Sequence, residues 1–315
     1  MGTIAAGLAS SHAFTLIDPE TWDERRAWNR GSYKKRYGVE PPQQPQVDSE
    51  TLHSIRPRYQ RIRSGLERLR DELAVMRPDA LIVIGDDQDE NYHEDNMPQF
   101  AIYTGDRVRA VAHGEDGGEY ACHAELAQAI LEGCVAQGFD LAYSRQFPNG
   151  ELKSHAHGPP LQILTPERDI PIVPLFVNAI HFPAPEPARC HALGQAIARV
   201  IKGRPAGERV AIYASGGLSH FTAGYPWKSY SGPYTHGAIC TDFDHSIVDL
   251  MRQGKASKLA ELTSKDLLAN GDIEFRSWLI LLGALGDRPA TEVMYEPFYR
   301  AIMGMAVGFW SNGAH

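Results

Sequence analysis

The sequence lacks the features that mark several classes of protein. It has only four cysteines and no C-x-x-C pair, which argues against a thiolate zinc module or a disulfide framework. The small number of cysteines predicts a reducing compartment. The first residues carry no basic segment before they turn polar at Ser10, so we expect a cytoplasmic protein. No apolar run approaches the roughly 18 residues that a membrane span needs, so no membrane association is expected.

Positive charge is also in short supply. Lys and Arg total 31 against 39 Asp and Glu, which gives a net charge of −8. An acidic surface repels phosphate backbones, so we expect no nucleic-acid partner. Internal repeats and low-complexity tracts are absent as well. The 315 residues, 43% of them hydrophobic, are enough for a sizeable core, and we expect one catalytic domain over residues 1–315.

Short apolar runs that end in polar residues alternate with longer segments of helical spacing. The runs predict strands at 3–9, 80–84, 139–143, 170–177 and 210–214, and the spacing predicts helices at 52–76 (broken near Pro57), 120–137 and 190–201, with more helices over 242–285. Such alternation predicts an α/β fold with a central mixed or parallel sheet flanked by helices. Ligands of these sheets bind beyond the carboxyl ends of the strands.

Residues 18–50 interrupt this alternation with a polar stretch rich in Trp, Tyr, Arg and Lys. We expect short helices around 22–29. The plain interpretation is a solvated surface or an oligomer contact. A segment of this length is also typical of a lid or insertion over a binding site, and its basic, aromatic character would suit an anionic aromatic ligand.

Five side chains that bind metals or protons lie at or near the predicted strand ends and at one helix start. His12 and His220 follow buried strands, His155 and His157 share the loop SHAHGPP, and Glu274 opens a helical segment. Taken singly, each is more often a hydrogen-bonded surface residue, and Glu274 a charge stabilised by the helix dipole. Together they favour one site.

The chemistry of such a set is specific. Two neutral ligands and one carboxylate on one face of Fe(II) leave open positions for a substrate and dioxygen. A further histidine that does not bind the metal would act as acid and base, because its proton exchanges near neutral pH.

Six segments carry a family resemblance. In order they are GLASSHAF at 7–14, VIGDDQDE at 83–90, DNMPQFAIYTG at 95–105, PLFVNAIHFPAPEPARCHALG at 174–194, ASGGLSHF at 214–221 and GDIEFRSWL at 271–279. Over about residues 3 to 308 the chain resembles the class III (type II) extradiol ring-cleavage dioxygenases, the superfamily of the protocatechuate 4,5-dioxygenase catalytic (beta) subunit. The resemblance implies an Fe(II) cofactor, a catechol-type diol or aminophenol substrate, and insertion of both atoms of O₂.

By position, the resemblance implies roles for several residues. His12 is the first metal ligand and Glu274 the carboxylate ligand, His220 is the acid and base, and His155 contacts the substrate or the oxygen-derived group. His157, the neighbour of His155, has no clear counterpart, and we place it with the substrate-binding residues. Tyr225, just after His220, would line the same pocket.

The second metal ligand departs from the family pattern. Better-known members carry a histidine at the end of the second strand, where this chain reads Asp86-Asp87-Gln88. We favour Gln88, through its amide oxygen, with His53 of the preceding helix as a replacement close behind. Asp87 or Glu90 is the third option. A set of ligands rich in oxygen weakens the case against Mn(II) or Zn(II), although Fe(II) remains our expectation.

Two other functional classes stay open at this point. One is a zinc-type hydrolase or lyase on the same fold, and the other is a non-catalytic binding protein that has lost the metal. For assembly, the resemblance implies a homo-oligomer, joined in some members by a small helical partner subunit.

Overall fold

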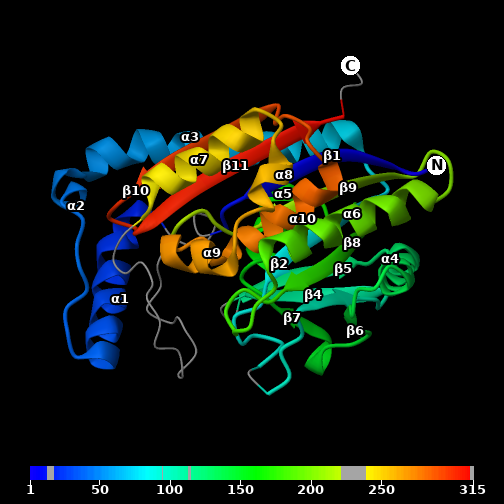
Figure 1. The fold of residues 1–315 in the computed structure, drawn as a ribbon, viewed down its shortest axis with the longest axis horizontal. Helices are drawn as coiled ribbons and strands as arrows, with labels where there is room; N and C mark the ends of the chain where they lie inside the picture. The colour runs from blue at the N-terminus through cyan, green and yellow to red at the C-terminus, as the bar shows by residue number, and fades with distance from the viewer. Residues whose placement is uncertain (13–17, 94, 113–114, 221–238, 313–315) are drawn as a thin grey trace.

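An eight-stranded mixed sheet forms the centre of the molecule (Figure 1), in the order β10-β11-β1-β9-β2-β8-β3-β6. The structure is a computed structural model and describes residues 1–12, 18–93, 95–112, 115–220 and 239–312. The strands of this sheet are β1 (Thr3–Ser10), β2 (Ala80–Asp86), β3 (Phe100–Tyr103), β6 (Ala142–Ser144), β8 (Ile172–Val177), β9 (Arg209–Ser215), β10 (Glu292–Phe298) and β11 (Met303–Ser311). The predicted α/β class is therefore confirmed.

A second, three-stranded sheet and a set of helices complete the described fold. The small sheet has the order β5-β4-β7, with β4 (Arg107–Ala112), β5 (Glu115–Ala121) and β7 (Glu151–Lys153). The helices are α1 (Trp22–Tyr37), α2 (Gln46–Ser49), α3 (Leu52–Met76), α4 (Ala124–Ala136), α5 (Gly158–Leu164), α6 (Pro187–Gly203), α7 (Thr241–Arg252), α8 (Ala256–Leu259), α9 (Ser264–Asn270) and α10 (Arg276–Leu285), with short 3₁₀ turns η2 (Pro19–Thr21), η3 (Pro148–Gly150) and η4 (Ile273–Phe275).

The four central strands run parallel, and their ends are level. Ser10 of β1 pairs with Ser215 of β9, and Ala214 of β9 pairs with Ile84 of β2. The polypeptide therefore leaves β1, β9 and β2 at neighbouring positions on one edge of the sheet, as expected for the carboxyl ends of parallel strands. Residues that follow these three strands start out as neighbours although they are up to about 200 positions apart in the sequence.

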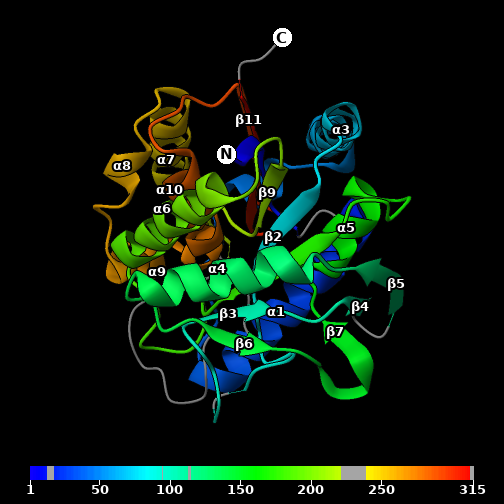
Figure 2. The same ribbon diagram turned by 90° about the vertical axis from the view of Figure 1, so that its right-hand side faces the viewer.

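The central strands are apolar throughout because both faces of the sheet are covered. Along β2, Leu81 and Val83 belong to one buried cluster, and Ile82 and Ile84 belong to the other, which is the two-residue alternation of a strand. Figure 2 shows α6 and α10 on one side of the central strands and α3 and α5 on the other. The site edge is thus carried by a rigid, fully packed sheet.

The expected break of α3 at Pro57 is wrong. The helix is continuous over Leu52–Met76, with Pro57 inside it and a capping box formed by Thr51 and Ser54. A proline in a helix costs about 3 kcal/mol. The helix buries a stripe of apolar side chains, each worth about 1.5–3 kcal/mol, and their sum outweighs the lost hydrogen bond. They are Ile55, Ile62, Leu66, Leu69 and Leu73.

Two further elements have other bounds than predicted. The helix expected from Tyr120 begins at Ala124, because Glu115–Ala121 is strand β5. The strand expected at 139–143 is shifted to Ala142–Ser144. The signal for the small sheet was present, since β4 alternates between exposed and mainly buried residues, as a half-buried strand does.

The segment 18–50 is mostly helical and is attached to the body of the protein. Its helix α1 is longer than the short helices predicted, and Trp22 is buried against Tyr59 and Phe298, with ring centroids 5.9 and 5.0 Å away. Gln44 forms two hydrogen bonds with the backbone of Ile239, at 3.1 and 2.8 Å. Whether the segment works as a lid stays a prediction.

None of the helices in the described part of the chain combines the length and the apolar character that a bilayer crossing requires.

Candidate active site

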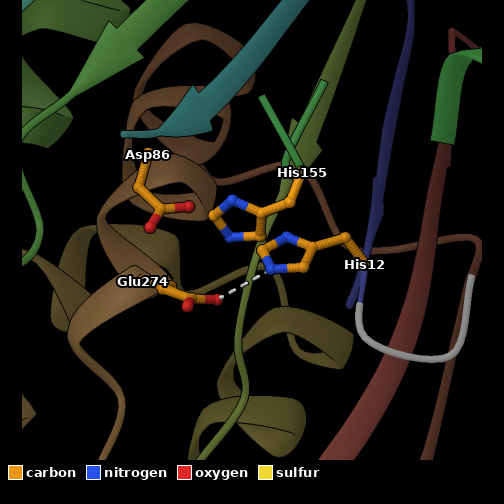
Figure 3. Close-up of side chains that lie close together, drawn as sticks. All are labelled: His12, Asp86, His155 and Glu274. Atoms are coloured by element: carbon orange, nitrogen blue, oxygen red, sulfur yellow. Dashed lines mark ion pairs between the residues drawn. The ribbon is translucent and has the colours of Figure 1, made fainter. Parts of the chain in front are cut away.

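Four buried side chains converge at the carboxyl ends of the central strands (Figure 3). They are His12, Asp86, His155 and Glu274, and each offers one ligand atom within 4.8 Å of the others. His12 lies two residues after β1, Asp86 ends β2, His155 follows β7, and Glu274 lies in η4. The sheet order explains the meeting of the first two, because β1 and β2 both flank β9.

His12 is held as a neutral ring. Its Nδ1 lies 3.2 Å from the Ser215 hydroxyl, and its Nε2 lies 3.7 Å from Glu274 Oε2. Burial disfavours the charged imidazolium and lowers the pKa of His12 to about 3, although the Glu274 carboxylate opposes this. A neutral imidazole keeps a lone pair on one nitrogen, which is the form that binds metals.

Glu274 is placed by the two glycines of the GGLSH turn. A Cβ on Gly216 would lie only 3.0 Å from Glu274 Cβ, and both Gly216 and Gly217 have positive φ. The Gly217 N–H donates to Glu274 Oε2 at 3.1 Å. Burial raises the pKa of Glu274, but His220, His12 and His155 together outweigh it, so the pKa lies below its usual range. Glu274 is therefore a carboxylate.

His220 is oriented by its own turn. Its ring Nδ1 lies 2.9 Å from the Leu218 carbonyl, which can only accept, so Nδ1 carries a hydrogen. Its Nε2 lies 3.0 Å from Glu274 Oε1. Burial alone would lower the pKa of His220, but Glu274 overrides this and raises the pKa to about 9. The nitrogen that faces the site is thus the one that exchanges a proton.

His155 is oriented by Glu90. The Glu90 carboxylate accepts from the backbone N–H of His155 at 2.9 Å and lies 2.8 Å from His155 Nδ1. Burial alone would lower the pKa of His155, but the charge and the hydrogen bond of Glu90, together with the charges of Asp86 and Glu274, outweigh this and raise the pKa to about 10. Because Nδ1 is directed at Glu90, Nε2 remains for the centre of the site, where the His12 and His155 rings meet edge to face with centroids 4.6 Å apart.

Asp86 and Gln88 form the remaining wall. Asp86 is fully buried, and Gln88 Nε2 donates to Asp86 Oδ2 at 3.0 Å and to Glu274 Oε1 at 2.9 Å. Burial and the negative charge of Glu274 raise the pKa of Asp86 to about 7. The second oxygen, Asp86 Oδ1, has no hydrogen-bond partner among the residues that the structure describes. Two imidazoles and two carboxylates, one with an unpartnered buried oxygen, fit a divalent cation.

Residues 39–309 match the family model described as the catalytic LigB subunit of aromatic ring-opening dioxygenase. The chain belongs to this family.

Similar curated proteins carry the names of dioxygenases of aromatic compounds. The chain is 31% identical over 187 residues to the gallate dioxygenase of Pseudomonas putida, a match that covers 56% of this chain and 49% of the relative. It is 32% identical over 155 residues to a 2,3-dihydroxyphenylpropionate/2,3-dihydroxicinnamic acid 1,2-dioxygenase of Escherichia coli, covering 48% of this chain and 46% of the relative. The matched part thus spans about half the length of these relatives.

A solved structure shows the same fold. An uncharacterized protein from Escherichia coli K12 superimposes with a TM-score of 0.53 at 15% identity, over 96% of this chain and 99% of that chain.

Several residues predicted from the family pattern do lie together. His12, His155 and Glu274 belong to the buried cluster described above, and His220 lies beside it, 3.0 Å from Glu274. Gln88 is also at the site, but its nitrogen and not its oxygen faces the two carboxylates, because an ionised carboxylate can only accept.

The alternative second ligands are not brought to the centre by the structure. His53 is exposed on the first turn of α3 and is not part of the buried donor group. Asp87 accepts hydrogen bonds from the backbone of Glu90, Asn91 and Tyr92 and so folds its own loop. Glu90 holds His155, as described above.

His157 does not present a polar atom to a substrate. Its Nε2–H donates to the Leu175 carbonyl at 3.1 Å, so the ring is neutral when Nδ1 accepts from the Ser154 hydroxyl at 2.7 Å. Burial lowers the pKa of His157 to about 4. The ring packs over Gly85, where an added Cβ would lie 2.7 Å from it. His157 is thus part of the packing behind β2, and the expectation of substrate contact is not supported.

Tyr225 falls in residues 221–238, outside the described part of the chain. Asp86 is the site residue that the sequence interpretation missed. Its signal was its place as the last residue of a buried, apolar strand.

Proposed function

We propose that the protein is an extradiol dioxygenase that uses Fe(II) to open the ring of a catechol-type substrate. The observation that carries this proposal is the buried convergence of His12, His155 and Glu274 with His220 beside them, in a chain of the ring-opening dioxygenase family. The substrate class that fits is a ring diol such as protocatechuate, gallate or a methylgallate, or an aminophenol, with O₂ as second substrate.

His12 and Glu274 would hold the metal. The neutral ring of His12 and the low pKa of Glu274 both favour this role. When bound, Fe(II) supplies Lewis acidity and a template for the diol and O₂. The burial of the whole group excludes bulk water, which strengthens every electrostatic contact inside the site.

His220 would move the proton. Its Nδ1–H is committed to the Leu218 carbonyl, so Nε2 is the atom that takes the proton of a substrate hydroxyl and returns it to an oxygen later in the reaction. Glu274 Oε1 lies 3.0 Å from this nitrogen and raises the pKa of His220 to about 9. Engagement of the Glu274 carboxylate by a metal would remove this stabilisation of the charged ring and lower the pKa of His220, so that Nε2 could lose its proton and accept one from the substrate.

His155 would hold the oxygen-derived group. With Nδ1 directed at Glu90, its Nε2 is presented to the centre at a fixed angle. A hydrogen bond from this nitrogen supports the negative charge that develops on oxygen.

Replacing His220 tests this assignment. In His220→Phe we expect turnover to fall by about 10²–10⁴-fold, because acid–base catalysis contributes about that much, while bound iron stays at the wild-type level. His245→Ala, an exposed histidine outside the cluster, is the control and should change neither quantity. Turnover of His220→Phe within a factor of about three of the wild type would remove this residue from the mechanism.

A further inference from the structure

The end of β2 holds a carboxylate whose contacts are incomplete. Asp86 is fully buried, its Oδ2 accepts from Gln88, and its Oδ1 has no hydrogen-bond partner among the described residues. An unpaired buried carboxylate oxygen is costly unless something binds it. Figure 3 shows Asp86 directed toward the same centre as His12, His155 and Glu274, and its ligand atom lies within 4.8 Å of theirs.

Gln88 takes a different part in this arrangement. One amide nitrogen donates to both Asp86 Oδ2 and Glu274 Oε1, at 3.0 and 2.9 Å. An amide nitrogen has no lone pair to give to a metal, and the amide oxygen lies at the other end of the group. Gln88 therefore clamps two carboxylates at a fixed separation, as outer partners of metal ligands commonly do.

From these contacts we propose that Asp86 is the second metal ligand of this protein, together with His12 and Glu274, and that Gln88 is a positioning residue. The inference rests on the proposed function, because it concerns the metal of that site. Along an extended chain, residues two apart leave on the same side, so Asp86 and Gln88 can both face the site. A carboxylate from Asp86 then supplies the metal donor, because the atom that Gln88 turns toward the two carboxylates is its nitrogen.

This inference is tested by comparing how much Fe(II) affinity is lost when Asp86 is replaced and when Gln88 is replaced. We would dialyse metal-free protein anaerobically against Fe(II) and measure the bound metal for the wild type, Asp86→Asn and Gln88→Ala. We expect Asp86→Asn to weaken the Kd by more than about 100-fold, and Gln88→Ala by the roughly 10–100-fold typical of an outer partner. Asp89→Asn removes a carboxylate of the same loop that pairs with His181, and it should bind like the wild type.

Thermal unfolding guards against a trivial loss of the fold. Fe(II) should raise the Tm of the wild type and leave the Tm of Asp86→Asn almost unchanged. Without metal, Asp86→Asn should melt at or above the temperature of the wild type, because the substitution removes a buried unpaired charge. The inference would be overturned if Asp86→Asn kept the wild-type affinity for Fe(II), or lost less of that affinity than Gln88→Ala. The proposed function would then still stand. A wild type that binds no Fe(II) would overturn both.

Discussion

At the scale of single residues, a site residue could be predicted where it follows an apolar run that marks the end of a strand, or where it lies in a recognisable motif. His12 and His220 follow apolar runs, and the loop of His155 and the helix start of Glu274 carried motif signals. Asp86 was missed because only the contacts show which residue of Asp86-Asp87-Gln88 faces the centre. The polar group that each one meets depends on loops far away in the sequence, so no local pattern reveals it.

Glu90 offers a test of the electrostatics at this scale. His155 has its pKa raised to about 10 by Glu90 against the effect of burial, and the unfolded value is about 6.5. The folded state therefore holds the extra proton, and this contribution to the free energy of unfolding is complete below about pH 6.5 and is lost as the pH rises through about 10.

In Glu90→Gln we expect a lower pKa of His155 and a free energy of unfolding that declines less than the wild type's between pH 6.5 and 10. Urea unfolding of the metal-free proteins across this range measures the difference. Glu167→Gln, an exposed glutamate, is the matched control. Parallel pH profiles for Glu90→Gln and the wild type would show that the carboxylate does not govern His155.

At the scale of helices and strands, elements with a clear local pattern of apolar residues were predicted, and several that depend on pairing or packing were not. Helix α3 was recognised by its apolar spacing, yet its continuity through Pro57 depends on packing that a local rule ignores. The predicted helix start at Tyr120 failed because residues 115–121 pair as a strand with the preceding β4, where Val108 lies opposite Tyr120. The strands β10 and β11 were not predicted, because only their pairing next to β1 places them in the sheet.

Helix α1 gives a prediction at this scale. Trp22 is buried against Tyr59 and Phe298, whereas Trp28 on the same helix is 65% exposed. Trp22→Ala should lower the free energy of unfolding by about 3–5 kcal/mol, the usual cost of removing a buried tryptophan. Trp28→Ala should change it by less than about 0.5 kcal/mol. Urea unfolding checks both, and similar losses for the two variants would mean that α1 is not anchored as described.

At the scale of the whole molecule, the strand order produces the site. Placing β9 between β1 and β2 brings the chain ends that carry His12, Ser215 and Asp86 to one edge. The fold class and the location of the site could be predicted from the alternation of elements, but strand order could not, because it is set by long-range pairing. A homo-oligomer, a small partner subunit and a cytoplasmic setting stay predictions.

The proposed function requires that this edge of the sheet bind Fe(II) and open aromatic rings with O₂. The most direct measurement is anaerobic reconstitution with Fe(II), followed by oxygen-electrode recording over a panel of catechols, gallates and aminophenols. We expect at least one ring diol or aminophenol to be consumed with one molecule of O₂ per molecule of substrate, yielding a ring-opened product. Iron-loaded protein that consumes no O₂ with any member of the panel would contradict it and favour a hydrolase, a lyase or a binding protein on the same fold.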